Sequence, residues 1–300
     1  MRTSVLLPLA LICVVATVPA SAQSPVLFGG NGGHSQPPSI NEGWLVRINQ
    51  TDASVTPIGH PDGVARLSGL AFDATGALFG ATQVAGGFPP PPGPLSTSDL
   101  IRINPLTGSL VSNIGPITAG GKGISIADLA VQPGTDALFG VESPQDGLGQ
   151  QGNLYRIDKQ TGVATLLGNT GFFFDSIAFA PDGTLYLASA NLGPRGTVAD
   201  IGLRTLDPTN ALILSSVTTN DFFGALGVRP TDGVIFGGTG DTHMIFTIDP
   251  VNGAETLVGD TGNNFIGAFA FSVPEPGALS LLLGLGLSGA GFAARRRRRR

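Results

Sequence analysis

Few side chains in this sequence have the type and spacing of a catalytic or metal-binding group. The three histidines, His34, His60 and His243, are far apart and form none of the close histidine pairs that bind zinc. The single cysteine, Cys13, lies near the N-terminus, so the remainder of the chain has no thiolate nucleophile, disulfide or cysteine-ligated zinc. We therefore predict no catalytic residue, no cofactor and no metal site, and regard enzymatic activity as the less favoured reading.

Three further patterns resemble binding or catalytic motifs without the context that such motifs need. Residues 147–152 match G-x-G-x-x-G literally, but a strand pattern follows them, whereas a nucleotide site needs a helix there. Asp158, Asp207 and Asp249 each follow a strand pattern at a turn, which favours turn hydrogen bonds over calcium ligation. Paired carboxylates for glycoside cleavage cannot be assigned from spacing alone, because their separation defines the reaction.

Charge is sparse and segregated along the chain. Charged residues make up 12% of the 300 residues, hydrophobic residues 42%, and 45 residues are glycine. Of the 16 basic residues, seven are Arg2 and the six terminal arginines, which leaves nine against 21 acidic residues, a formal charge of −12. An acidic body excludes nucleic-acid binding by phosphate neutralisation.

The N-terminus has the three parts of a secretory signal peptide, predicted over residues 1–22. Arg2 provides the positive start, and an almost unbroken apolar stretch follows from Val5 to Val18. Ala20 and Ala22 are the small residues that signal peptidase reads, so we expect cleavage before Gln23. A retained membrane anchor is the less favoured alternative, because the apolar stretch is short.

The C-terminus also has three ordered parts, over residues 274–300. A short motif, Pro274, Glu275 and Pro276, precedes residues 277–294, which carry no charge. As a helix, these 18 residues would rise about 27 Å, just enough to span a bilayer. A basic stop that stays on the cytoplasmic side follows, consisting of Arg295, Arg296, Arg297, Arg298, Arg299 and Arg300.

This C-terminal arrangement resembles the PEP-CTERM sorting signal of exported bacterial proteins. The resemblance covers about the last 27 residues, beginning at Pro274. It implies processing by exosortase, a transient stay in the inner membrane, and a final place at the cell surface or in the extracellular matrix of bacteria that make exopolysaccharide. The alternative is a plain C-terminal anchor.

The body of the chain is a repeat of four short strands, which we name A, B, C and D. The A and B strands form one recurring phrase, found at 69–82, 128–141, 176–189 and 225–238. The C and D strands form a second phrase, found at 100–115, 154–168, 203–217 and 245–259. Turns such as 181–183, 107–108 and 252–253 contain the Gly and Asn that hairpin turns require.

Repeats of this kind predict an all-β fold, a β-propeller with one repeat in each blade. Residues 267–272 repeat strand A alone, whereas 26–30, 44–49 and 54–59 match strands B, C and D. We therefore predict a five-bladed propeller over residues 23–273, whose last blade combines three N-terminal strands with one C-terminal strand. The phrasing resembles the NHL and SMP-30-type propeller families. An open stack or two sandwiches are the alternatives.

The connections between strands differ between the two faces of such a propeller. The A–B and C–D turns are tight, whereas the B–C connections at 31–43, 83–99, 142–152 and 190–201 are long. Phe174 and Phe223 share the register of core positions, so we expect both to be buried. The D–A connections should reach the mouth of the central channel, and they provide the candidate ligand-binding residues Arg66, Lys122, Phe172, Asp175, Asn220, Asp221 and Asn264.

The sequence thus supports a hypothesis about destination more strongly than one about activity. The leading hypothesis is an exported surface or matrix protein whose propeller binds a polysaccharide or a protein partner. The alternative is a secreted propeller enzyme, such as a lactonase or a polysaccharide lyase or hydrolase. A purely structural spacer is the third hypothesis.

Overall fold

The computed structural model describes residues 24–32, 41–83, 97–142, 152–192, 198–240 and 242–272. Every regular element in these ranges is a β-strand, and none contains a helix that is long and apolar enough to cross a membrane. The chain divides into Ser24–Val273, which contains all the strands, and a second unit made of Met1–Gln23 and Pro274–Arg300. The predicted leader, sorting tail and 277–294 helix lie outside the described residues.

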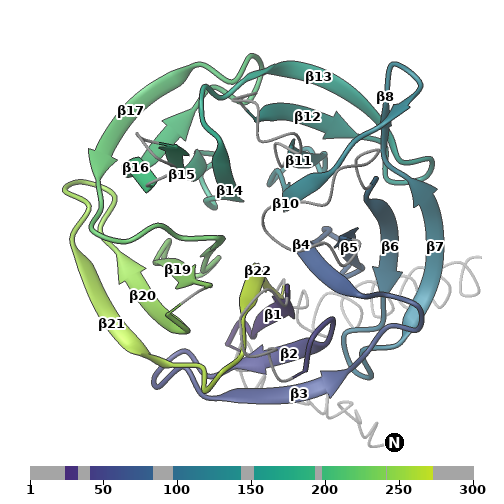
Figure 1. Cartoon of the computed structure of the whole chain (residues 1–300), viewed down its shortest axis with the longest axis horizontal. Coiled ribbons are helices and arrows are strands. Elements are labelled where there is room, and N and C mark those ends of the chain that lie inside the picture. Colours follow the sequence, from purple (N-terminus) through teal and green to yellow (C-terminus); the bar gives the residue numbers. More distant parts are fainter. Residues whose placement is uncertain are drawn as a thin grey trace, which may run out of the picture. The chain divides into compact units, whose positions relative to one another are not determined.

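Five sheets, each built on four antiparallel strands and each forming one blade, are arranged in a ring around a central axis (Figure 1). Blade 1 contains β4 (Arg66–Phe72), β5 (Leu78–Gln83), β6 (Asp99–Ile103) and β7 (Leu110–Pro116). Blade 2 contains β10 (Ile126–Val131), β11 (Leu138–Glu142), β12 (Asn153–Ile157) and β13 (Val163–Asn169). Blade 3 contains β14 (Phe174–Phe179), β15 (Leu185–Leu192), β16 (Val198–Leu206) and β17 (Ile213–Thr218). Blade 4 contains β18 (Ala225–Val228), β19 (Ile235–Thr239), β20 (Met244–Ile248) and β21 (Glu255–Asp260).

Blade 5 closes the ring with strands from both ends of the described chain. It contains β22 (Ile266–Phe271), β1 (Leu27–Asn31), β2 (Leu45–Ile48) and β3 (Val55–Gly59), in that order. The ladder runs from the pair Leu27 and Phe271 to the pair Asn31 and Ile266. Two further bonds extend it: the Ser272 N–H donates to the Val26 carbonyl at 2.9 Å, and the Val26 N–H donates to Ser272 Oγ at 2.8 Å. The predicted five-bladed closure is confirmed.

The tight turns form through the residues that the sequence placed in them. Gly108, Gly162 and Gly253 have positive φ in three C–D turns, as hairpin geometry requires. Each C–D turn begins with an Asn or Asp whose Oδ1 accepts the N–H two residues later; these residues are Asn49, Asn104, Asp158, Asp207 and Asp249. The turn-bonding interpretation of Asp158, Asp207 and Asp249 is therefore confirmed.

Around the axis, a small residue of each A strand packs against a large residue of the next blade. Ala71 shares a buried cluster with Leu129, and Ala130 shares one with Ile177. In blade 4 the small residue is Gly227, where a Cβ atom would lie 3.0 Å from Phe269 Cβ. This alternation lets five inner strands approach one axis, because a larger side chain at the small position would separate the blades.

At the perimeter, the D strand of each blade meets the C–D turn of the next blade at backbone contact. A Cβ atom on Gly59 would collide with the Thr107 carbonyl, one on Gly168 with the Asn210 carbonyl, and one on Gly259 with the Asp52 carbonyl. At the other two junctions the glycine belongs to the turn. There, Gly162 faces the Pro116 carbonyl and Gly253 faces the Thr218 carbonyl. Each of the five junctions thus has a glycine on at least one side.

Two connections differ from the sequence prediction. Residues 190–201 were expected to form a loop, but β15 continues to Leu192 and β16 begins at Val198, so most of this segment lengthens the hairpin of blade 3. Residues 118–123, expected in a D–A loop at the channel mouth, instead form the hairpin of β8 (Thr118–Ala119) and β9 (Lys122–Gly123). This hairpin lies outside β13 of blade 2, because β8 pairs with β13 in parallel.

Replacing Gly259 with Ala should destabilise the propeller. The added Cβ would meet the Asp52 carbonyl of the neighbouring turn, and overpacking of this kind costs about 1–3 kcal/mol of unfolding free energy. Chemical denaturation of residues 24–272 measures the change. Gly224→Ala is the control, because a Cβ there meets only Phe222 Cε1 at 3.9 Å. Equal stability of the two variants would contradict the proposed role of the perimeter contact.

Candidate functional site

The propeller has two chemically different faces. We call the face that carries the A–B and C–D turns the turn face, and the opposite face, which carries the B–C and D–A connections, the loop face. On the turn face, Lys159 of a C–D turn forms salt bridges with Asp73 and Asp136, which flank two A–B turns. Both kinds of tight turn therefore lie together, as the sequence predicted.

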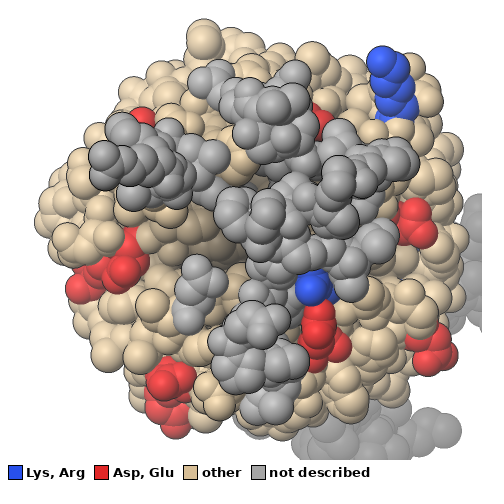
Figure 2. Space-filling view, viewed as in Figure 1, with Lys and Arg blue, Asp and Glu red and all other residues tan. Residues whose placement is uncertain are grey.

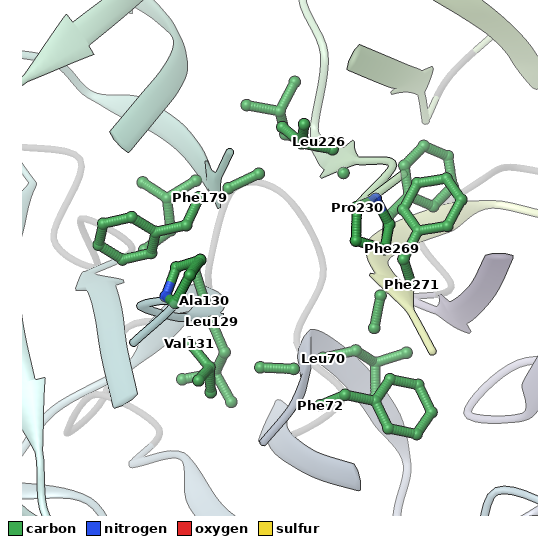
Figure 3. A pocket seen from close by; sticks show the side chains of 17 residues that line it. Leu70, Phe72, Leu129, Ala130, Val131, Phe179, Leu226, Pro230, Phe269 and Phe271 are labelled. Carbon is green, nitrogen blue, oxygen red and sulfur yellow. The ribbon is translucent and has the colours of Figure 1, made fainter. Parts of the chain in front are cut away.

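The central channel contains an apolar cavity of about 140 Å³. Its walls are the inner strands of all five blades, and Figure 3 shows Phe72, Phe179 and Phe271 beside it. Pro133 and Pro230, which belong to A–B turns, also line the cavity, so it extends to the turn face. The lining offers shape and apolar contact, with no charged side chain among its residues.

Among the predicted ligand-binding residues, Arg66 lies at the start of β4 and forms an ion pair. Its Nε donates to Glu42 Oε1 at 2.8 Å, and its side chain is largely covered. Lys122 is exposed in β9, at the outer edge of blade 2, because its loop folds into the β8–β9 hairpin. These two cations therefore do not converge on one site.

Phe172 is a core residue and does not present its ring at a channel mouth. Only 6% of it is exposed, and its ring packs in the cluster that contains Ile177 and Leu187. The Arg204 guanidinium lies 3.9 Å from the centre of this ring, and its Nη2 donates to Asp200 Oδ1 at 2.7 Å. The prediction for Phe172 is thus corrected, because the long β15–β16 hairpin supplies an arginine that covers the ring.

Arg204 occupies a position that is apolar or aromatic in the other blades. It stands in β16 where β12 has Tyr155 and β20 has Phe246, and only 4% of it is exposed. Its Nη1 donates to Ser189 Oγ at 2.7 Å and to the Gly202 carbonyl at 3.2 Å. Stacking on an aromatic ring and several acceptors together stabilise a buried guanidinium.

The remaining predicted residues are separated as well. The Asn220 and Asp221 N–H groups both donate to Glu255 Oε1, at 2.7 and 3.1 Å, beside the perimeter junction of blades 3 and 4. Burial, and secondly the Glu255 charge, raise the pKa of Asp221. Asp175 lies in β14 and pairs with Ser189; its side chain and that of Phe174 lie outside the described residues. Phe223 is buried, as predicted.

Asn264 forms several hydrogen bonds between connections of the loop face. It is 4% exposed, and its Nδ2 donates to the Thr261 carbonyl at 2.6 Å. Its Oδ1 accepts from Asn41 Nδ2 at 3.1 Å, and its carbonyl accepts from Thr261 Oγ1 at 2.8 Å. These bonds tie the connections of blades 4 and 5 together, which explains why this amide is buried.

A polar network that the sequence did not predict lies at the loop-face end of blade 2. Glu142 Oε2 accepts from Asn153 Nδ2 at 2.7 Å and from the Tyr155 hydroxyl at 3.0 Å. Asn169 Nδ2 donates to Asn153 Oδ1 at 2.9 Å. Burial, and secondly the Glu142 charge, raise the pKa of Tyr155 to about 12, so the phenol stays a donor. We call Glu142, Asn153, Tyr155 and Asn169 the blade 2 network.

The blade 2 network holds a carboxylate in a fixed position on the loop face. Within the described residues, Glu142 Oε2 receives both hydrogen bonds, whereas Oε1 has no partner there. A carboxylate oxygen fixed by an amide and a phenol is a suitable acceptor for ligand hydroxyl or amide groups. Only the pairing register of the strands brings these four residues together, so their spacing along the chain could not predict the network.

No group of three His, Cys, Asp or Glu side chains that could hold a metal ion occurs in the part of the chain that the structure describes.

Comparison with known proteins identifies the C-terminal segment. The family model described as "PEP-CTERM protein-sorting motif" matches residues 272–299. The chain carries a PEP-CTERM sorting motif. The motif implies that the protein is exported and is sorted by exosortase, as the sequence predicted. No curated protein matches the chain.

Among solved structures, one chain of a nidogen/laminin complex is similar at a TM-score of 0.52 and 13% identity, covering 84% of this chain and 99% of that chain. This likeness supports the propeller fold and nothing further. Two others, each at a TM-score of 0.44, are a protein of unknown function from Bacteroides caccae and a putative 6-phosphogluconolactonase from Bacteroides fragilis. The Bacteroides caccae protein is 13% identical, and the match covers 83% of this chain and 99% of that chain. The Bacteroides fragilis protein is 11% identical, and the match covers 85% of this chain and 100% of that chain.

The PEP-CTERM motif directly adjoins the closing ladder. Its match begins at Ser272, whose N–H still donates to the Val26 carbonyl. The pair of Leu27 and Phe271 occupies the position that Leu78 and Phe72 occupy beside the A–B turn of blade 1. Both ends of the propeller therefore leave from the turn face, in place of the missing A–B turn of blade 5.

Asp128 is a buried carboxyl group at the junction of blades 2 and 3. Its Oδ2 accepts from the Ile177 N–H at 3.1 Å and its Oδ1 from the Leu129 N–H at 2.8 Å. Burial dominates these bonds and raises its pKa well above the ordinary value. The unfolded chain therefore binds fewer protons than the folded one above about pH 4, so Asp128 lowers stability as pH rises from there.

Replacing Asp128 with Asn should flatten the pH dependence of stability. The wild type should lose unfolding free energy relative to the variant from about pH 4 upward, with a slope of at most about 1.4 kcal/mol per pH unit. Denaturation of both proteins at a series of pH values measures this slope. A hydrogen bond that the Asn variant loses at every pH would shift its whole stability curve and leave the slope unchanged. Parallel stability curves would contradict the assignment.

Proposed function

We propose that this protein displays its loop face, away from the sorted end, to a polysaccharide or protein partner at the cell surface or in the extracellular matrix. The observation that carries the proposal is that both ends of the described propeller leave from the turn face, where Leu27 pairs with Phe271. A segment that attaches the protein through its C-terminus would hold the turn face close to the attachment. The loop face, with its long B–C connections, then lies farthest from it.

The chemistry of the described surface fits a hydroxyl-rich ligand better than a polyanion. Acidic side chains are spread around the periphery of the face seen in Figure 2. The blade 2 network adds a fixed carboxylate acceptor and amide groups on the loop face, which are the groups that bind sugar hydroxyls or peptide amides. Exopolysaccharide outside the cell is accordingly our first candidate ligand, and a surface protein is the second.

The predicted processing steps complete the proposal. Signal peptidase cleaves before Gln23, the 277–294 segment holds the chain in the inner membrane, and the basic stop keeps the terminus on the cytoplasmic side. Exosortase then acts at the Pro-Glu-Pro motif. Because the closing strands are Leu27–Asn31 and Ile266–Phe271, both cleavages would leave the ring intact.

Epitope tags inserted on the two faces should differ in accessibility on intact cells. A tag within residues 84–96, a B–C connection, should be labelled by antibody. A tag at Asp182–Gly183, in an A–B turn, should be labelled much less, because the turn face lies beside the attachment. Blots of denatured cells control for expression. Equal labelling, or stronger labelling of the turn, would contradict the proposed orientation.

Residues 24–272 contain every strand and both sides of the closing ladder, so this fragment serves for binding measurements. Glu142→Gln should weaken binding to the cognate polysaccharide about tenfold. A hydrogen bond to a charged group contributes about 1.5–3 kcal/mol, and a loss of about 1.4 kcal/mol weakens binding tenfold. Glycan arrays and co-sedimentation with exopolysaccharide provide the measurement. Asp182→Asn, which removes an exposed carboxylate of the turn face, is the matched control and should leave binding unchanged.

Three results would count against the proposal. Binding that responds to Asp182→Asn and not to Glu142→Gln would place the ligand on the turn face. Failure to retain any glycan or surface protein would favour the spacer hypothesis. Degradation of the retained polymer would favour the enzymatic alternative.

A further inference from the structure

The D strand is the outermost strand of the sheet in four of the five blades, and in blade 2 the β8–β9 hairpin pairs with part of its outer edge. Such edges carry backbone N–H and C=O groups that can pair with a strand of another molecule, and proteins commonly protect them. The five D strands of this propeller, β3, β7, β13, β17 and β21, allow the protection to be compared within one chain.

Four of the five edges carry a protecting feature. β3 has Pro57 at its centre, and β7 has two register irregularities and ends at Pro116. β8 covers the start of β13 at Val163 and Ala164, and a register irregularity opposite Leu154 and Tyr155 interrupts the rest of the strand. β21 begins and ends with the acidic residues Glu255 and Asp260. Proline, bulges, covering segments and charges are the usual means of blocking edge pairing.

β17, Ile213–Thr218, has no proline, no charged residue and, within the described residues, no covering strand. No proline, glycine or charged residue occurs in it or in the adjoining residues 209–220. Its single irregularity, opposite Thr205 and Leu206, lies at the start of the strand. Leu212, Ile213 and Leu214 are 64%, 44% and 68% exposed, and they form the longest run of consecutive exposed large hydrophobic residues in the described chain. A six-residue segment of this composition has a strong tendency to pair with a copy of itself.

We propose that β17 is the interface through which two copies of this protein associate, by antiparallel pairing of their outer edges. An antiparallel pair of identical strands is related by a two-fold axis, which is the commonest symmetry of soluble dimers. Because the other four edges carry protecting features, assembly stops at two copies. The inference is independent of the ligand proposed for the loop face.

A second copy is the favoured occupant because of charge. Without Arg2 and the six terminal arginines the chain is strongly acidic, so two copies of the propeller repel each other over most of their surface. The β17 edge is an uncharged strip on this acidic body, and pairing there brings no carboxylates into direct opposition. The chain itself shows that such an edge accepts a further strand, since β8 has added to the corresponding edge of blade 2.

Leu214→Lys in residues 24–272 tests the proposal. Light scattering coupled to size-exclusion chromatography should give a dimer mass for the wild type and a monomer mass for the variant. Leu257→Lys on β21 is the matched control, because this leucine is also an exposed D-strand residue, at 56% exposure, and the dimer mass should persist. Circular dichroism should show equal folding of both variants.

Hydrogen exchange at high and low protein concentration provides a second measurement that needs no variant. The concentration-dependent protection should be confined to amides of β17 in blade 3. A wild-type protein that stays monomeric at the highest concentration would overturn the proposal. So would a dimer that survives Leu214→Lys, one that is lost equally in Leu257→Lys, oligomers larger than two, or protection located on another blade.

Discussion

The close backbone approach between neighbouring blades is the constraint on which this fold depends. Each D strand ends against the C–D turn of the next blade, and a glycine such as Gly59 or Gly253 allows the contact. The same spacing holds near the axis, where Ala71 and Gly227 leave room for large residues of the next blade. Five wedge-shaped blades can close a ring only when contacts at both radii are this short, so small residues recur in the repeat as a geometric requirement.

Closure also defines how the two faces are used. Because β22 and β1 complete blade 5, the two ends of the propeller at Leu27 and Phe271 take the place of one tight turn on the turn face. Apolar side chains fill the channel wall toward that face, whereas the blade 2 network places polar groups on the loop face. The molecule is thus asymmetric along its axis although its blades are nearly equivalent.

Much of the fold could be predicted from the sequence, because the repeat encodes local chemistry. The Asx residues at C–D turns, the glycines with positive φ and the orphan strands at both ends each follow from residue types at fixed spacing. The candidate site was predicted less well. Phe172 and Asn264 are buried by contacts with Arg204 of β16 and Asn41 of a B–C connection, which no spacing rule associates with them. The β8–β9 hairpin was missed because two-residue strands carry no periodic pattern.

The position of β22 has a mechanical consequence. The sorted tail continues directly from this innermost strand, and β22 is held to the sheet through the single ladder with β1. If the loop face is bound while the tail is anchored, tension runs along the length of β22 and loads the bonds of that ladder together, in shear. Strands pulled lengthwise resist far more force than strands peeled apart one bond at a time. A ring closed in this way can transmit a pull between its C-terminal strand and a molecule bound to the loop face without opening.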